Sequence, residues 1–161
     1  MDSIFLKAED LGIRLEIVDN LPIWEASPAA RHQLAVERIS ASIQPVINSV
    51  SDCACVHISD VYVQFPHGSL KRPDISVFCR LPNELDEAVT LVPEAVVEVI
   101  SRGYEVKDLK LAPPFYLRHG VKDVVIFNPY TLEIFHYSND GMTELKSPAE
   151  IEFKCGCRCV V

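Results

Sequence analysis

The sequence predicts an α/β fold in which a mixed β-sheet is flanked by helices. Short runs rich in Val and Ile recur along the chain, and their length and β-branched residues are typical of strands. The clearest of these runs span residues 75–79, 94–100 and 122–127. Two longer segments, 28–44 and 105–119, have helical character and connect the strand-like parts of the chain.

The composition favours one soluble domain that covers residues 1–161. A chain of 161 residues can bury a core without staples, and 48% of its residues are hydrophobic. It contains no apolar run near the ~20 residues that a membrane span needs, so we expect no membrane partner. Residues 1–7 lack the basic start and long apolar segment of a signal peptide, which predicts a cytoplasmic protein.

The formal net charge of −8 argues against binding to nucleic acid by bulk electrostatics. The negative charge is unevenly distributed, however. From Lys71 to Lys122 the basic and acidic residues are equal in number, and the rest of the chain carries the whole acidic excess. A neutral face on an acidic body can approach a phosphate backbone, especially where a divalent cation lies between acidic side chains. We therefore expect weak or local contact with DNA.

Further strand-like runs lie at residues 13–18, 22–25, 54–58, 61–65, 131–137 and 151–161. The first two flank the turn-forming pair Asp19-Asn20, which predicts an N-terminal hairpin. The run at 94–100 is mostly Val and Ile and carries Glu98, so we expect that strand to be buried on both faces.

The first helix is predicted from Pro28 to about Gln44. Ser27 is a favourable N-cap, Pro28 suits the first helical position, and Pro45 should kink or end the helix. Apolar residues recur at helical spacing at Val36, Ile39, Ile43, Val46 and Val50. His32 falls on the same stripe and should face inward, where its position alone favours a satisfied core histidine over a catalyst.

The second helix is predicted between residues 105 and 119. Gly120 suits the position just past a helix end. Pro113-Pro114 lies inside the segment and should kink the helix or delay its regular part.

Six cysteines allow three interpretations. No Cys-x-x-Cys occurs, and residues two apart on a strand lie about 6.6 Å from each other, which is wide for two ligands of one zinc. We therefore expect reduced, partly buried structural thiols in a reducing compartment. A disulfide framework and a cysteine-based metal protein are the alternatives.

Two acidic residues belong to strand-like runs, Asp74 at the head of one and Glu98 inside the other. Such burial is costly unless a cation lies between them. Carboxylates at the same end of neighbouring strands can hold Mg²⁺ or Mn²⁺, which polarises a phosphodiester and generates a nucleophilic water. A nearby lysine can assist that water and stabilise the developing charge. The same residues also occur as caps and ion pairs, so the pattern by itself is a weak signal.

The order of several motifs adds a resemblance. These motifs are Ser27-Pro28, Arg31-His32-Gln33, Arg72-Pro73-Asp74-Ile75-Ser76-Val77, Val97-Glu98-Val99-Ile100-Ser101, Asp108, Tyr116, Gly120-Val121 and Phe127-Asn128-Pro129. From about Leu15 to Tyr137 the chain resembles the Uma-type putative restriction endonuclease family. That family belongs to the restriction-endonuclease-like superfamily, whose signature is Pro-Asp followed by Asp/Glu-x-Lys. The resemblance implies a restriction-endonuclease-like fold.

The resemblance also implies roles for particular residues. Asp74 and Glu98 would be the two acidic metal ligands, and the carbonyl of Val99 a third metal contact. His32 would lie at the edge of the site, which places the site role and the core role of this histidine on an equal footing.

This sequence departs from the family at the lysine. The superfamily position two residues after the Glu is Ile100, and the family's position four residues after Asp108 is Ala112. Lys110 is the first candidate for a replacement and Lys107 the second. If both are solvated, the enzyme is weakened or inactive.

Three other residues match the family. Ser101 is expected to be a cap or turn residue, since no base is evident beside it. Asp108 could orient a lysine, bind a second metal or cap a helix. Tyr116 could hydrogen-bond near the site, although a partly buried packing role is the favoured interpretation.

The function predicted from these residues is a divalent-metal-dependent endonuclease that hydrolyses DNA phosphodiester bonds. The alternative is a catalytically degenerate nuclease fold that serves as a binding or assembly module, which Ile100, Ala112 and the acidic surface favour. A homodimer is expected if both DNA strands are cut at once, because the fold offers one site per chain.

Overall fold

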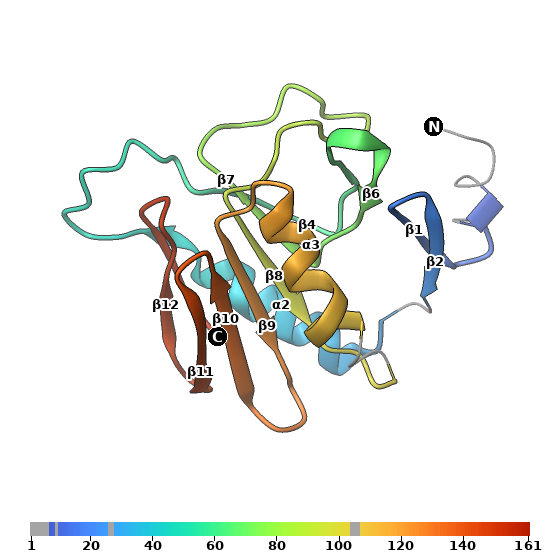
Figure 1. Cartoon of the computed structure of the whole chain (residues 1–161). Helices are drawn as coiled ribbons and strands as arrows, with labels where there is room; N and C mark the ends of the chain where they lie inside the picture. The colour runs from blue at the N-terminus through green and yellow to red at the C-terminus, as the bar shows by residue number, and fades with distance from the viewer. Residues whose placement is uncertain (1–6, 9, 26–27, 104–106) are drawn as a thin grey trace.

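The computed structural model describes residues 7–8, 10–25, 28–103 and 107–161. A six-stranded mixed sheet with strand order β11-β10-β9-β8-β7-β4 forms its centre (Figure 1). In chain order its strands are β4 (Val56–Ser59), β7 (Ile75–Phe78), β8 (Ala95–Val99), β9 (Asp123–Phe127), β10 (Glu133–Ser138) and β11 (Gly141–Lys146). The neighbours β8 and β9 run parallel, and the other neighbours run antiparallel. The predicted mixed sheet is confirmed.

Two helices flank this sheet, α2 (Ala30–Ser42) on one face and α3 (Ala112–Arg118) on the other (Figure 1). Val36 and Ile39 of α2 pack with residues such as Val97 of β8 in one apolar cluster. The other cluster joins residues of α3 to Val96 of β8 and Ile126 of β9. Every residue of β8 is buried, as the Val-rich run predicts for a strand with both faces covered.

Two smaller sheets lie beside the central one. The first has the order β2-β1-β6-β5, with β1 (Arg14–Val18), β2 (Leu21–Glu25), β5 (Val63–Gln64) and β6 (Leu70–Lys71). The second has the order β12-β13-β3, with β3 (Gln44–Pro45), β12 (Glu150–Glu152) and β13 (Cys157–Val160). A short 3₁₀ turn, Pro66–Gly68, connects β5 to β6. The antiparallel pair β1–β2 confirms the predicted N-terminal hairpin.

The first helix is shorter than expected. It begins at Ala30, and its N-cap Ala29 offers no side-chain hydrogen bond. The expected cap Ser27 lies outside the described residues. The helix ends at Ser42, before it reaches Pro45. Ile43 has an extended backbone and leads into β3, which contains Pro45. The apolar spacing therefore stops being helical at Ile43, and Val50 is fully exposed.

The second helix starts late, as the two prolines predict. A π-helical turn, Lys107–Leu111, precedes α3. Pro113 and Pro114 fall in the first turn of α3, the part of a helix that tolerates proline best. Gly120 follows the helix with a φ of +96°, which fits the expected helix end.

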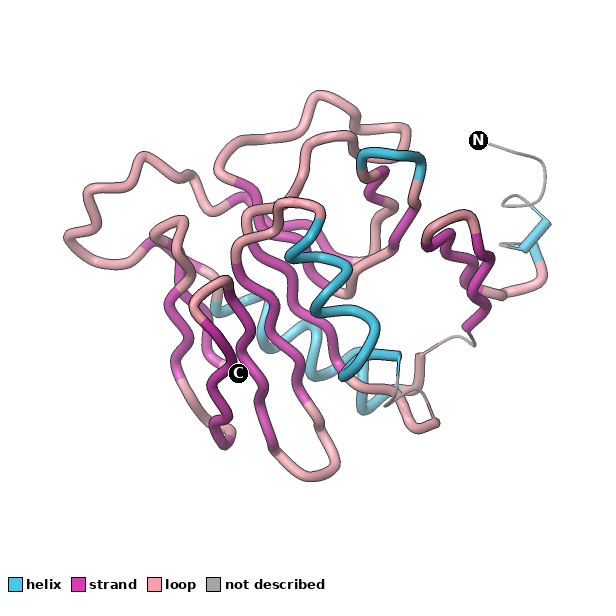
Figure 2. The backbone as a smooth tube through the Cα atoms, viewed as in Figure 1, coloured by secondary structure: helices cyan, strands magenta, loops and turns pink. Residues whose placement is uncertain are grey.

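The expectation of reduced thiols is wrong for four of the six cysteines. Disulfides join Cys53 to Cys79 and Cys55 to Cys157, whereas Cys155 and Cys159 are buried free thiols. The prediction considered only cysteines two residues apart on one strand. The bonded cysteines instead come from different segments of the chain, 26 and 102 residues apart. Residues 46–55 form a loop before β4 (Figure 2), and Cys55 has a φ of +50°.

Within the part of the chain that the structure describes, no helix has the length and apolar character to cross a membrane.

Candidate active site

The structure brings Asp74 and Glu98 face to face. Ile75 of β7 pairs with Val97 of β8, so the next antiparallel step places Asp74 opposite Glu98. The Asp74 N–H donates to Glu98 Oε2 at 3.3 Å, and the Val99 N–H donates to Asp74 Oδ2 at 2.8 Å. Asp74 is 5% exposed and Glu98 is 7% exposed. Two carboxylates therefore share one nearly dry site.

Two basic side chains approach Asp74. His32 of α2 is buried, and its Nε2 atom lies 3.0 Å from Asp74 Oδ2. The Nη1 atom of Arg14, on β1, lies 3.5 Å from Asp74 Oδ1. Opposed carboxylates repel each other, and these groups offset part of that cost. His32 faces inward as predicted, and it contacts the expected site residue.

Tyr116 contacts Glu98 from the opposite helix. Its hydroxyl donates to Glu98 Oε1, and its side chain is fully buried on α3. Burial, and then the negative charge of Glu98, hold the pKa of Tyr116 well above its usual value. The hydroxyl therefore stays protonated and continues to donate. The favoured interpretation as a partly buried packing residue is wrong, since Tyr116 is fully buried and makes the hydrogen bond near Glu98 that was its alternative.

A third buried carboxylate lies beside this pair. Glu16 of β1 accepts from Lys71 Nζ at 2.6 Å and from the Arg72 N–H at 2.9 Å. Both side chains of the Glu16–Lys71 pair are 2% exposed. The Nζ atom of Lys71 also lies 5.6 Å from the centre of the Tyr116 ring. Tyr116 thus contacts Lys71 through its ring and Glu98 through its hydroxyl.

Sequence reasoning missed Arg14, Glu16 and Lys71. Arg14 and Glu16 are two residues apart on β1, so they project to the same face of the hairpin. Only the pairing of β1 with β6, at Ile17 and Leu70, places this face over the site. The sequence offered no signal for this contact, because charged residues at alternate positions are also what an ordinary solvent-facing strand carries.

The expected lysines are placed differently. Lys110 is exposed on the π-helical turn. The side chains of Lys107 and Asp108 lie outside what the structure describes. Ile100 and Ala112, which stand where the families carry lysine, are both buried in the apolar cluster beneath α3. These two positions supply packing to that cluster.

A groove of about 550 Å³ lies between the β1–β2 hairpin and α3, and Lys71 is one of its lining residues. Leu21, Pro22, Pro114 and Phe115 provide much of its apolar surface. Lys71 is almost fully buried, so only a small part of it borders the groove.

The donor set at the carboxylate pair fits a hard divalent cation. Carboxylate and carbonyl oxygens are the ligands that Mg²⁺ and Mn²⁺ prefer, and Asp74, Glu98 and the Val99 carbonyl offer them at one strand end. A carboxylate oxygen has two lone pairs, so a hydrogen bond from Tyr116 or the backbone leaves capacity for a metal. Among described residues, three or more His, Cys, Asp or Glu ligand atoms within 4.8 Å of one another occur only in cysteine groups.

Comparison with known proteins identifies the fold and the family of this chain. No protein of curated function matches the chain. A solved structure, described as a "putative nuclease belonging to DUF820 from Anabaena variabilis ATCC 29413", is 19% identical and superposes with a TM-score of 0.64. The match covers 85% of this chain and 79% of that one, which confirms the expected nuclease-like fold. Residues 4–152 match the Uma2 family, described as "Putative restriction endonuclease", and the chain therefore belongs to that family.

Proposed function

We propose that this protein is a divalent-metal-dependent endonuclease that hydrolyses DNA phosphodiester bonds. Asp74, Glu98 and the carbonyl of Val99 would hold Mg²⁺ or Mn²⁺. The observation that carries the proposal is the pair of opposed, buried carboxylates at one end of β7 and β8. Family membership supports the nuclease class, and the oxygen donors support the metal.

The bound cation would supply Lewis-acid polarisation of the scissile phosphate and a water of lowered pKa. The protein's own residues would prepare the site for this chemistry. His32 and Arg14 hold the Asp74 carboxylate in place, and the Tyr116 hydroxyl orients Glu98. Their rigid positions remove the cost of ordering the two carboxylates when substrate arrives.

We assign the catalytic cation first to Lys71. It is buried beside Tyr116, which itself contacts Glu98, and it lines the groove beneath the hairpin. In this dry setting its ammonium group would stabilise developing phosphate charge in competition with Glu16, its present partner. Lys110 and Lys107, the lysines expected from the sequence, are the competing assignments.

Three exposed side chains next to the site supply a surface for DNA. Tyr130 is 41% exposed, and guanidinium groups lie near its ring, Arg31 at 5.5 Å and Arg102 at 5.3 Å from the centroid. Arg31 precedes His32, and Arg102 and Tyr130 follow the adjacent ends of the parallel strands β8 and β9. Arginine is suited to phosphate, and an aromatic ring to a base.

The proposal is tested by nicking of supercoiled plasmid DNA with Mg²⁺ or Mn²⁺. Asp74→Asn and Glu98→Gln preserve shape, and each should lower the rate by at least about a hundredfold because a metal ligand is lost. Asp86→Asn is the matched control, since Asp86 is exposed in the loop between β7 and β8. Equal cleavage by wild type and Asp74→Asn would overturn the assignment of the site.

One observation favours the second candidate, a nuclease fold that binds without cutting. The Asp74 carboxylate already contacts two basic side chains, so the site is partly neutralised without a metal. Calorimetry with Mn²⁺ distinguishes the two functions. Saturable binding that disappears in Glu98→Gln supports the enzyme, whereas DNA binding without metal binding or cleavage supports the module.

Light scattering with and without DNA tests the homodimer that double-strand cutting requires.

A further inference from the structure

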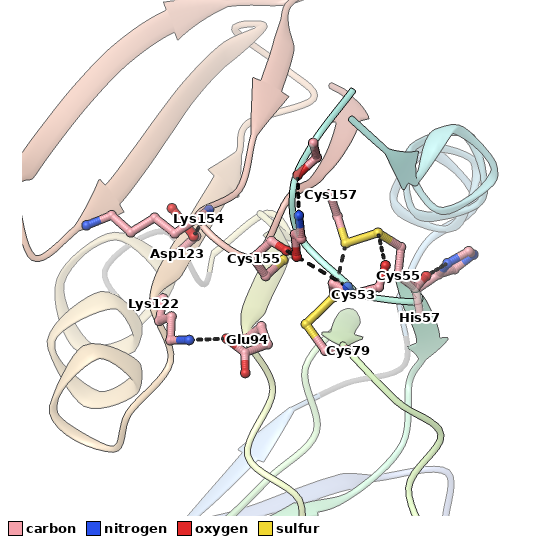
Figure 3. The surroundings of a disulfide bond; sticks show 12 residues. Cys53, Cys55, His57, Cys79, Glu94, Lys122, Asp123, Lys154, Cys155 and Cys157 are labelled. Carbon is pink, nitrogen blue, oxygen red and sulfur yellow. Dashed lines mark hydrogen bonds and ion pairs between the residues drawn. A yellow bond between two sulfur atoms is a disulfide. The ribbon is translucent and has the colours of Figure 1, made fainter. Parts of the chain in front are cut away.

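Five of the six cysteines lie close together, and none of them belongs to the carboxylate site. Their sulfur atoms form what we call the cysteine cluster, made of Cys53, Cys55, Cys79, Cys155 and Cys157 (Figure 3). Two groups of three have all their sulfurs within 4.8 Å of one another, and both groups contain Cys53. The first adds Cys55 and Cys157, and the second adds Cys79 and Cys155.

The distances of the first group suit three thiolate ligands of one zinc, and Cys79 or Cys155 would have to move toward that group to become the fourth. Zinc–sulfur bonds of about 2.3 Å place the sulfurs of a tetrahedron about 3.8 Å apart. Cys53 Sγ and Cys157 Sγ are not bonded to each other and already lie 3.5 Å apart. The free thiol of Cys155 lies within 4.8 Å of both sulfurs of the Cys53–Cys79 disulfide. Two structural disulfides alone need only four sulfurs and do not explain why a fifth is so close.

The backbone holds these segments together without help from sulfur bonds. The Ala54 N–H donates to the Cys79 carbonyl at 3.0 Å, which fixes the loop at the end of β7. The Val46 N–H donates to the Gly156 carbonyl at 2.9 Å. The Ser51 hydroxyl donates to the Cys155 carbonyl and accepts from the Cys53 N–H. Reduction of the disulfides would therefore leave the cysteine cluster largely assembled.

The two turns that carry the cluster are tightly packed against each other. Gly156 has a φ of +87°, and a Cβ atom there would lie 2.5 Å from Ser51 Cβ. Only glycine permits this approach of the Cys-Gly-Cys turn to the loop. The close approach brings Cys155 and Cys157 to the sulfurs of the loop.

We propose that the reduced protein binds one Zn²⁺ ion in the cysteine cluster, through Cys53, Cys55, Cys157 and a fourth thiolate from Cys79 or Cys155. A dithiol reductant first converts both disulfides to four thiols, and two dithiol molecules become disulfides in exchange. Binding then releases one proton for each thiol that coordinates as thiolate. Oxidation of the same sulfurs to disulfides excludes the metal. This site is independent of the proposed nuclease chemistry.

The first experiment uses the full-length chain purified with a dithiol reductant, stripped of metal by a chelator and dialysed with Zn²⁺. Elemental analysis should find about one zinc per chain. Replacement of Zn²⁺ by Co²⁺ should give intense thiolate-to-cobalt charge-transfer absorption and the visible bands of a tetrahedral ion. The disulfide-bonded protein should show neither signal. Reduced, folded wild type without stoichiometric zinc or the cobalt–thiolate spectrum would overturn the proposal.

Variants assign the ligands. Cys53→Ser removes the sulfur shared by both groups and should abolish the cobalt–thiolate spectrum. The double variant Cys79→Ser/Cys155→Ser removes both sources of the fourth ligand and should lose the four-thiolate spectrum as well. Cys159→Ser is the matched control, because Cys159 is a buried cysteine outside both groups. An unchanged spectrum in Cys53→Ser would overturn the proposal, and circular dichroism verifies that each variant is folded.

A second control separates this metal from the one proposed at the carboxylates. Glu98→Gln should leave zinc content and the cobalt–thiolate absorption unchanged, since Glu98 belongs to neither sulfur group. Loss of the thiolate signal in Glu98→Gln would contradict the independence of the two sites. Loss of plasmid nicking with an intact cobalt–thiolate spectrum is the expected result.

Discussion

The Nζ atom of Lys71 lies 2.6 Å from Oε2 of Glu16, and solvent reaches only 2% of either side chain. This ion pair joins the N-terminal hairpin to the strand that leads to Asp74. Because a buried charge is costly without its partner, each residue depends on the other. The pair also places an ammonium group beside the ring of Tyr116, one side chain away from Glu98.

Lys71→Met should lower the free energy of unfolding by about 3–5 kcal/mol, because it leaves Glu16 buried without its cation. The double variant Lys71→Met/Glu16→Leu removes both charges and should recover most of that loss. Urea unfolding measures both effects. Plasmid nicking should stay low in the double variant if Lys71 stabilises phosphate charge. Full activity in a stable double variant would transfer that role to Lys110 or Lys107.

Tyr116→Phe should lower the nicking rate by about tenfold across the pH range, since Glu98 loses the hydroxyl donor that orients its carboxylate. The measurement is the nicking rate against pH with Mn²⁺. Tyr137→Phe on β10 is the control and should leave the profile in place. A Tyr116→Phe profile identical to that of wild type would show that this hydrogen bond does not tune the site.

Alkaline unfolding provides a separate test of the buried phenol. Burial raises the pKa of Tyr116 well above its ordinary value of 10.0. The folded state therefore holds this proton when the unfolded chain has lost it, so the contribution to stability is complete below the unfolded pKa and falls as pH rises beyond it. Stability should decline above about pH 10, and Tyr116→Phe should reduce that decline relative to Tyr130→Phe, whose side chain is exposed.

Arg31→Ala and Arg102→Ala should weaken DNA binding for all sequences, because guanidinium contacts to phosphate carry no base information. Each variant should reduce the slope of log affinity against log salt by about one, as expected for one lost phosphate contact. Fluorescence anisotropy at several salt concentrations measures this slope. Arg80→Ala is the control, because Arg80 is exposed beyond the other end of β7. Equal slopes in all four proteins would place the DNA elsewhere.

The free thiols should be unreactive in the folded, disulfide-bonded protein. Burial raises the pKa of Cys159 to about 12 and also raises the pKa of Cys155. At pH 8 only about one Cys159 in ten thousand is then the reactive thiolate. A chromogenic disulfide reagent should react slowly before denaturation and with two thiols after it. Cys159→Ser should leave one, and six reactive thiols would show that the disulfides are absent.

Much of the fold could be predicted because local patterns determine it. The Val-rich run around Glu98, the hairpin at Asp19-Asn20 and the late start of the second helix at Pro113-Pro114 all appear in the structure. Each depends on residues close in sequence, through strand length, turn chemistry or the missing N–H of proline. The predicted end of the first helix was wrong, because Gln44 and Pro45 pair with β13 and are therefore part of a strand.

The candidate site divides in the same way. The sequence by itself determined the acidic pair, since Asp74 and Glu98 each mark the end or interior of a recognisable strand, and the inward face of His32. Only the tertiary structure decided that Glu16 and Lys71 join them, because that contact depends on how the hairpin sits over β6. The tertiary structure likewise decided that Cys53 bonds to Cys79 and lies beside Cys157. Contacts between segments that are distant in the sequence follow from packing, and no short-range sequence pattern encodes them.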